Sequence, residues 1–274
     1  MKKNILKEVI GNLRVEKDGY RRIPHKKGWL AFLEDGDMVF SPSDLRHILR
    51  RVISDNLPNG NKLLFLSKKN RFTVTADKES YRPEEALERF ITASNPDNVS
   101  SFFNQVPIGG GKESIDIVIK EEQSKKYCFV ELKPWTSTNS PLYAIVESLK
   151  NIAEYRIIFE EDIEHDKDFV YYSEVDLIIL APESYYREYG LTYDEKEKIS
   201  VVKKVLNDLS SEFKTNIALW ALPLEENDFQ AKLEMLCKRQ NVREQQIISI
   251  SESDAIPELA RRKWKLLVES DRKQ

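Results

Sequence analysis

A run from Val175 to Leu180, apolar at every position except Asp176, limits the folds that this 274-residue chain can adopt. A strand with apolar residues on both of its faces is covered on both sides, which is typical of a parallel sheet between layers of helices. The strand-like segments Ile115–Ile119, Tyr127–Leu132 and Ile217–Leu222 alternate along the chain with helical periodicities. This order predicts an α/β fold in which a mixed sheet is flanked by helices.

Four segments have the apolar spacing of helices that pack on a sheet. They are Pro83 to about Ser94, Pro141–Glu160, Asp194–Phe213 and Phe229–Cys237. Ser140 and Pro141 suit the N-cap and first position of the second of these helices. We expect the C-terminal end to form a strand over Gln246–Ile250 and a helix over Leu259–Val268.

Two connections are expected between these elements. The polar stretch Lys120–Lys126 predicts a hairpin between two strands, and the three glycines in Gln105–Gly111 predict a flexible turn. Lys112 follows these glycines, but the spacing is not that of a P-loop and a strand follows in place of a helix. We therefore expect a turn beside the functional site, with Lys112 placed to contact a phosphate.

Residues 1–77 are expected to form a small basic α+β module ahead of the main domain, 78–274. One helix begins at Ser41 or Ser43, and its apolar positions recur at helical spacing. The expected strands are Trp29–Leu33, Met38–Phe40, Leu63–Leu66 and Phe72–Thr75. Residues 1–75 contain 16 basic and 8 acidic side chains, whereas the rest of the chain contains 27 basic and 38 acidic ones.

The basic excess at the N-terminal end suits a polyanion, because phosphate contacts depend on local charge. The candidates for nucleic-acid binding in this module are Arg46, Arg50, Arg51, Lys68, Lys69 and Arg71. A solvated surface with uneven charge explains the same pattern equally well. The substrate-binding role of the module is therefore a hypothesis.

Several classes of protein are disfavoured by composition. No apolar run approaches the roughly 20 residues that cross a bilayer, and the N-terminus does not resemble a signal peptide. Two cysteines, Cys128 and Cys237, suit free thiols better than a disulfide framework. We expect a cytoplasmic protein that does not associate with membranes. The three histidines have no spacing typical of a zinc site.

Asp116 interrupts an apolar strand, where an acid lowers stability unless something binds it. On the next strand, alternation places Glu131 and Lys133 on one face and Leu132 on the other. Pro134 then ends regular pairing. Two carboxylates on neighbouring strands suit Mg²⁺ or Mn²⁺, and a lysine beside them suits phosphodiester hydrolysis. The backbone carbonyl of Leu132 is a further candidate metal ligand.

This constellation resembles the PD-(D/E)xK nuclease superfamily, whose fold is called restriction-endonuclease-like. Asp116 and Glu131-Leu132-Lys133, fifteen residues later, match its motif, although Ile115 stands where the family has proline. The resemblance covers about Pro83–Leu222 and implies a catalytic role for the acids and the lysine. It also implies an acid on the preceding helix, for which Glu88 is the first candidate and Glu84 the second.

The resemblance further implies that the helix Pro141–Glu160 lines the site, with Tyr143, Glu147 and Lys150 as candidates for substrate contacts. Trp135 follows Lys133 closely enough to stack on a base, but an aromatic residue after a strand more often packs in the core.

The leading interpretation is a metal-dependent nuclease, with DNA as the expected substrate. A nucleic-acid-binding module that kept the fold without cleaving is the first alternative. A protein-interaction role, with the acidic C-terminal body as the partner surface, is the second. A homodimer is compatible with the sequence.

Overall fold

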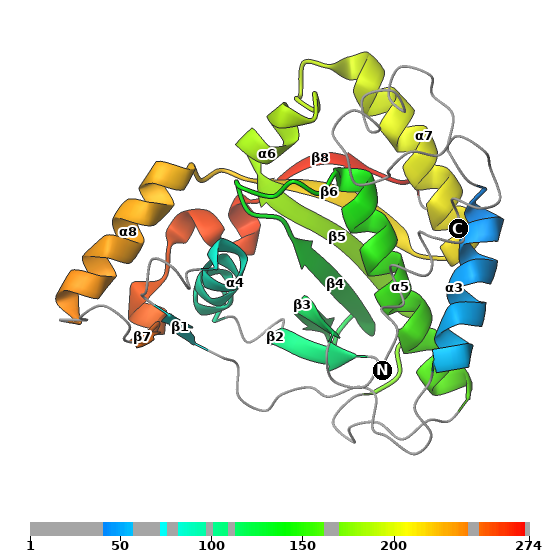
Figure 1. The fold of residues 1–274 in the computed structure, drawn as a ribbon, viewed down its shortest axis with the longest axis horizontal. Coiled ribbons are helices and arrows are strands. Elements are labelled where there is room, and N and C mark those ends of the chain that lie inside the picture. The colour runs from blue at the N-terminus through cyan, green and yellow to red at the C-terminus, as the bar shows by residue number, and fades with distance from the viewer. Residues whose placement is uncertain are drawn as a thin grey trace.

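Six strands form one mixed sheet at the centre of the protein (Figure 1). The structure is a computed structural model that describes residues 41–56, 72–75, 82–96, 101–108, 113–161, 170–240 and 247–271. In the order in which they lie side by side, the strands are β2 (Ser101–Ile108), β3 (Glu113–Glu121), β4 (Lys126–Leu132), β5 (Glu174–Pro182), β6 (Asn216–Leu222) and β8 (Lys265–Glu269).

Strand direction follows from the connections. The pairs β2–β3 and β3–β4 are antiparallel, and the turn between β3 and β4 falls in the expected Lys120–Lys126 segment. The pairs β4–β5 and β5–β6 are parallel because a helix crosses between the strands of each pair. The expectation of an α/β fold with a mixed sheet flanked by helices is confirmed.

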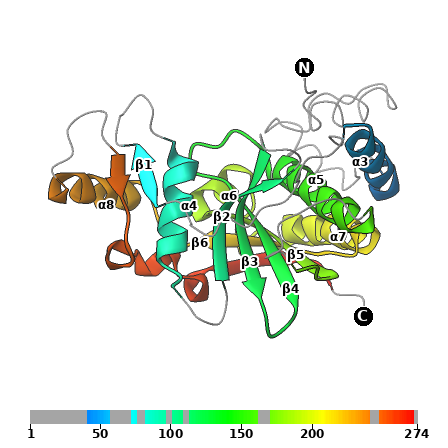
Figure 2. The same cartoon turned by 90° about the horizontal axis from the view of Figure 1, so that it is seen from below.

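Helices cover both faces of the sheet. One side carries α3 (Pro42–Asn56), α5 (Pro141–Glu160) and α7 (Lys196–Phe213), and the other carries α4 (Pro83–Ala93) and α8 (Glu226–Arg239) (Figures 1 and 2). The short helix α6 (Glu183–Glu188) follows β5. No helix in the described ranges is both long enough and apolar enough to cross a membrane.

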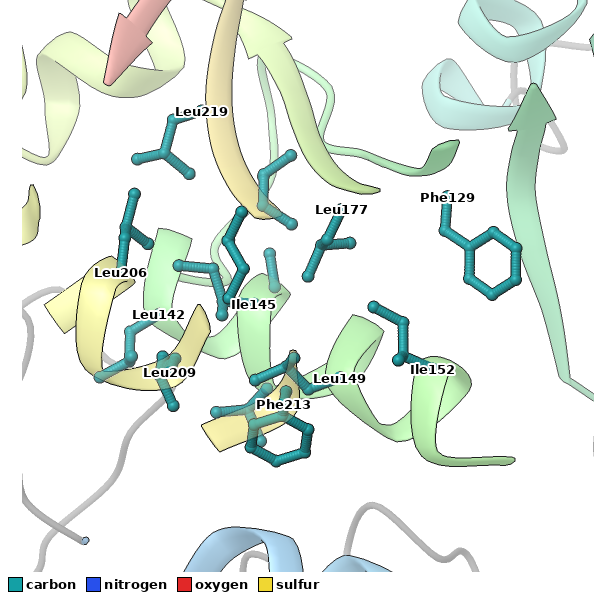
Figure 3. Close-up of a cluster of buried hydrophobic side chains, with 14 of the residues drawn as sticks. Phe129, Leu142, Ile145, Leu149, Ile152, Leu177, Leu206, Leu209, Phe213 and Leu219 are labelled. Atoms are coloured by element: carbon teal, nitrogen blue, oxygen red, sulfur yellow. The ribbon is translucent and has the colours of Figure 1, made fainter. Parts of the chain in front are cut away.

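Alternation along β4 divides the core into two clusters. Tyr127 and Phe129 pack with α3, α5 and α7, whereas Cys128, Val130 and Leu132 pack with α4 and α8. Figure 3 shows the first cluster, in which side chains of α5 and α7 meet those of β5 and β6. The predicted division of these residues between the two faces is confirmed. Cys128 and Cys237 are free thiols, as expected.

The N-terminal edge of the sheet differs from expectation. Ser101–Ile108 forms the strand β2, where the sequence predicted a turn beginning at Gln105. Pro107 is tolerated because β2 is an edge strand and needs fewer backbone hydrogen bonds. The buried Asn104 interrupts the apolar alternation and obscured the strand. The glycines at 109–111 and Lys112 lie outside the described residues.

The predicted helix Leu259–Val268 is wrong. Short 3-10 turns at Pro257–Leu259 and Arg261–Lys263 lead into β8, which pairs antiparallel with β6. The edge of β6 has backbone groups that need partners, and this tertiary pairing overrides the local helical spacing. In contrast, the expected strand near Gln246–Ile250 is present as β7 (Ile247–Ser249).

The described parts of residues 1–77 pack on the rest of the chain. Helix α3 contacts α5 and α7, and its residues Leu45 and Leu49 belong to the larger core cluster. The strand β1 (Thr73–Thr75) pairs with β7 from the C-terminal end of the chain. The strands expected at Trp29–Leu33, Met38–Phe40 and Leu63–Leu66 lie outside the described residues.

We predict that Leu49→Ala lowers the free energy of unfolding by about 2–5 kcal/mol, because Leu49 is fully buried and its loss leaves a cavity. Urea denaturation followed by circular dichroism should show one transition that moves as a whole. The control Arg51→Ala changes an exposed residue on the same helix and should shift stability by less than about 0.5 kcal/mol. Two unfolding transitions, of which Leu49→Ala shifts only the one at lower urea, would indicate an independent N-terminal module.

Candidate metal centre

The pairing of β3 with β4 brings Asp116 to Glu131. Ile117 is the partner of Val130, so the next pair in the same register is Asp116 and Glu131. The carboxylate of Asp116 accepts a hydrogen bond of 2.8 Å from the backbone N–H of Leu132. This bond fixes the acid at the point where regular pairing of the two strands ends.

Glu84 joins these two residues from the first turn of α4. One carboxylate oxygen each from Glu84, Asp116 and Glu131 lies within 4.8 Å of the other two. Pro83 begins the helix, and an acid in the first turn interacts favourably with the helix dipole. Oxygen ligands in this number suit a hard divalent cation such as Mg²⁺ or Mn²⁺.

Lys133 lies against the same carboxylates. Its Nζ is 2.5 Å from Glu131, 3.4 Å from Glu147 and 3.5 Å from Glu84. The Lys133 backbone N–H donates to the carbonyl of Leu180 at 3.0 Å, which extends the pairing of β4 with β5 past the end of the strand. The ammonium is therefore buried at the strand end among three acids.

Helix α5 forms one wall of the site. Ser140 caps the helix by accepting a hydrogen bond from the backbone N–H of Tyr143. The hydroxyl of Ser148 lies 3.4 Å from Glu131 and donates to the carbonyl of Ala144. A cavity of about 380 Å³ lies between this wall, α4 and the two strands. The expected residues Tyr143, Glu147 and Lys150 line it, together with Ser114, Asn139 and Asn151.

Burial and like charges shift the titration of this cluster. Burial raises the pKa of Asp116 well above its usual range, and the charges of Glu131 and Glu84 raise it further. Burial raises the pKa of Glu147 to about 8 and also raises that of Glu84. Burial opposes the charge on Lys133, but Glu131, Glu147 and Glu84 together raise its pKa well above its usual range. The cluster holds more acidic than basic groups, so a divalent cation would relieve its excess of negative charge.

Glu88 was the first candidate for the helical acid. The structure instead brings Glu84, the second candidate, to Asp116 and Glu131. The carboxylate of Glu88 is fully buried and accepts a hydrogen bond of 2.6 Å from the side chain of Gln105. Burial raises its pKa to about 8. Helical periodicity places residues four apart on one face, so the sequence alone did not separate these two acids.

Gln105 is a residue near the site that the sequence did not indicate. It falls opposite Asp116 in the register of β2 and β3, and it has a φ of 52°. This left-handed conformation is uncommon for a residue other than glycine. The side chains of Phe102 and Val106, on either side of it, pack in different core clusters. Only the inter-strand register reveals this position.

Arg46 and Arg50, two of the basic residues expected to bind a nucleic acid, pair with acids outside the cavity of the candidate metal centre. Arg46 pairs with Glu212 and Arg50 pairs with Glu160, both at 3.0 Å. Glu160 is thirteen residues after Glu147 on α5, about 20 Å along the helix axis. Arg51 is exposed on α3. Lys68, Lys69, Arg71 and Lys112 lie outside the described residues.

Trp135 is packed in the core. This agrees with the second of the two roles considered for it, core packing in place of base stacking. Its ring lies 5.1 Å from that of Phe229, measured between centroids, and its indole N–H donates to the carbonyl of Leu224. The contact of the Leu132 carbonyl with a metal ion stays a prediction.

No family model matches the chain, and neither a curated protein nor a solved structure is significantly similar to it.

We predict that the wild-type protein binds Mn²⁺ and that Glu84→Gln and Asp116→Asn each weaken binding by at least about tenfold, because each removes a charged ligand. Isothermal titration calorimetry at constant pH measures the affinity. Glu88→Gln is the matched control, one helical turn from Glu84, and should bind like wild type. A larger loss for Glu88→Gln than for Glu84→Gln would reverse the assignment of the helical acid.

We predict that Glu88→Gln stabilises the protein at high pH. The pKa of Glu88 rises from 4.5 to about 8 on folding, so the folded chain retains a proton that the unfolded chain releases between these values. The stability of the wild type should therefore fall as pH rises through this window. Urea denaturation should show that the advantage of the variant is absent at pH 4 and reaches at least about 1.4 kcal/mol at pH 9, the equivalent of one pKa unit. A constant difference at all pH values would contradict this assignment.

Proposed function

We propose that this protein is a metal-dependent nuclease with a restriction-endonuclease-like core, and that DNA is its substrate. The observation that carries the proposal is the meeting of Glu84, Asp116 and Glu131 within 4.8 Å, with Lys133 in contact with two of them. The agreement of this group with the acid and acid-x-Lys pattern of the PD-(D/E)xK nucleases supports it. The mixed sheet and its helices are compatible with that core.

Glu84, Asp116 and Glu131 would hold Mg²⁺ or Mn²⁺ in this proposal. The ion would supply Lewis-acid stabilisation of the charge that develops on the phosphate and would lower the pKa of an attacking water. The hydrogen bond from Leu132 N–H to Asp116 and the contact of Ser148 with Glu131 orient two of the three carboxylates. Such supporting contacts are typical of metal ligands that must keep one geometry.

Lys133 would act on the substrate side of this group. Its ammonium is the counter-charge of Glu131, Glu84 and Glu147. With Glu84 and Glu131 serving as metal ligands, Lys133 would keep Glu147 as its counter-charge and would be able to contact a phosphate oxygen. The ammonium would then orient the attacking water or stabilise charge on a phosphate oxygen.

The cavity favours cleavage over simple binding of nucleic acid. Glu84, Asp116, Glu131 and Glu147 line it, against two lysines. Such a surface repels a phosphate unless a cation is bound. In a module that binds nucleic acid without a metal, this arrangement would have no function, and the repulsion between its like charges would lower the stability of the fold.

We predict that Lys133→Met lowers the rate of DNA cleavage by at least about a hundredfold, because the variant lacks the charge beside the phosphate. The assay follows supercoiled plasmid, linear duplex and single-stranded RNA in Mg²⁺ or Mn²⁺. Lys126→Met is the control, since Lys126 lies at the other end of β4 and pairs with Asp176. Cleavage by Lys133→Met at the wild-type rate would remove the proposed role. Failure of the wild type to cut any substrate would leave the non-cleaving alternative.

A further inference from the structure

A second cavity lies where α3 packs on α5 and α7 (Figure 1). It has a volume of about 330 Å³ and shares no lining residue with the cavity of the candidate metal centre. Arg156, which lines it, follows Glu147 by nine residues on α5, about 14 Å along the helix axis. The residues that line this second cavity have no role in the proposed cleavage.

Positive charge is in excess around the second cavity. Four cationic side chains line it against two acidic ones, and these six residues are Arg46, Arg50, Arg156, Lys214, Glu160 and Glu212. Both acids already pair with the arginines of α3. In the part of the chain that the structure describes, neither Arg156 nor Lys214 forms an ion pair. These two residues therefore give the cavity its excess of positive charge.

Arg156 is held by uncharged acceptors at the end of α7. It donates hydrogen bonds to the backbone carbonyls of Phe213 and Lys214 and to the hydroxyl of Thr215. These bonds use three of its five N–H groups, and the partial charge of the helix end offsets only about half of its charge. Burial lowers the pKa of Arg156, and the like charge of Arg46 lowers it further. An anion in the cavity would stabilise the charged guanidinium.

An exposed aromatic ring lies beside these charges. Tyr171 lines the cavity and is 47% exposed. Its ring stacks on that of Tyr155, with centroids 5.8 Å apart and planes at 21°, and its centroid is 4.8 Å from that of Phe159. The two neighbouring rings fix its position while nearly half of the residue stays open. A fixed aromatic ring next to cationic side chains suits an aromatic ligand that carries negative charge.

We infer that this cavity binds a nucleotide, with its phosphate at Arg156 and Lys214 and its base stacked on Tyr171. A phosphate monoester carries nearly two negative charges at neutral pH, which matches the excess of positive charge. The volume is at the lower end of the range for small-molecule sites, so it suits a single nucleotide. Glu160 and Glu212 would repel a strand whose phosphates continue across the cavity. The inference does not depend on the proposed nuclease function.

The test is isothermal titration calorimetry with the common ribonucleoside 5′-monophosphates, with inorganic phosphate measured as a competitor. EDTA removes divalent cations, so the candidate metal centre takes no part. Lys214→Gln removes one charge and Tyr171→Leu removes the aromatic ring, and both side chains are exposed, so circular dichroism should show folded variants. Lys203→Gln is the matched control for charge, because Lys203 lies on α7 and pairs with Asp271 outside this cavity. Tyr193→Leu is the control for the ring, since Tyr193 is equally exposed and lines a different cavity.

The wild type should bind at least one of the monophosphates. Lys214→Gln should weaken binding of that nucleotide and of inorganic phosphate by about tenfold each, the effect of one charged hydrogen bond. Tyr171→Leu should weaken the nucleotide by at least about fivefold, the effect of one lost base stack, and leave the affinity for inorganic phosphate unchanged. Neither control variant should change either affinity.

The source of the nucleotide follows from the length of the ligand. A short 5′-phosphorylated oligonucleotide that binds at least as tightly as the monophosphate, and that loses affinity in Lys214→Gln, places the end of a strand in the cavity. Weaker binding of the oligonucleotide places a free nucleotide there.

Absence of binding of every monophosphate to the wild type at about 1 mM would overturn the inference. Equal losses of affinity in Lys214→Gln and Lys203→Gln would also overturn it. Nucleotide binding by a wild type that never cleaves DNA supports the site and removes only the nuclease assignment.

Discussion

The pairing of β3 with β4 is the interaction on which the candidate site depends. It sets Asp116 against Glu131, and the bond from Leu132 N–H to Asp116 holds the acid where pairing ends. The parallel pairing of β4 with β5 continues one residue further through Lys133 N–H. A shift of one residue in either register would turn these side chains to the opposite face. The chemistry of the site is thus set by backbone hydrogen bonds.

Helices from two core clusters complete the site. Glu84 comes from α4 and Glu147 from α5, and these helices pack in different clusters on the two faces of the sheet. Their acids meet at Lys133, at the end of β4. The two apolar clusters therefore hold these helices, and with them the acids, in place against the repulsion between like charges. Because desolvation raises the pKa of these acids, a cation at this position would stabilise their charged forms.

The cavity beside the proposed catalytic group is also lined by Lys150 and Asn151 of α5. Glu147 contacts Lys133 on one side, and Lys150 follows it by one turn of α5. One helix thereby contributes both an acid and a lysine to the lining of this cavity. In contrast, the arginines of α3 that pair with acids, Arg46 and Arg50, stabilise the packing of that helix on α5 and α7. Local charge along the sequence did not distinguish these two uses of basic residues.

The sequence by itself determined the α/β class, the strands β3 to β6 and the motif of Asp116, Glu131 and Lys133. These follow from periodicity, burial and the cost of an acid in an apolar strand, which act over a few residues. Only the tertiary structure decided that Glu84 joins the acids, because residues four apart on a helix are equivalent until a partner surface selects one. It also decided that Ser101–Ile108 and Lys265–Glu269 are strands, because each is held by pairing with a distant segment.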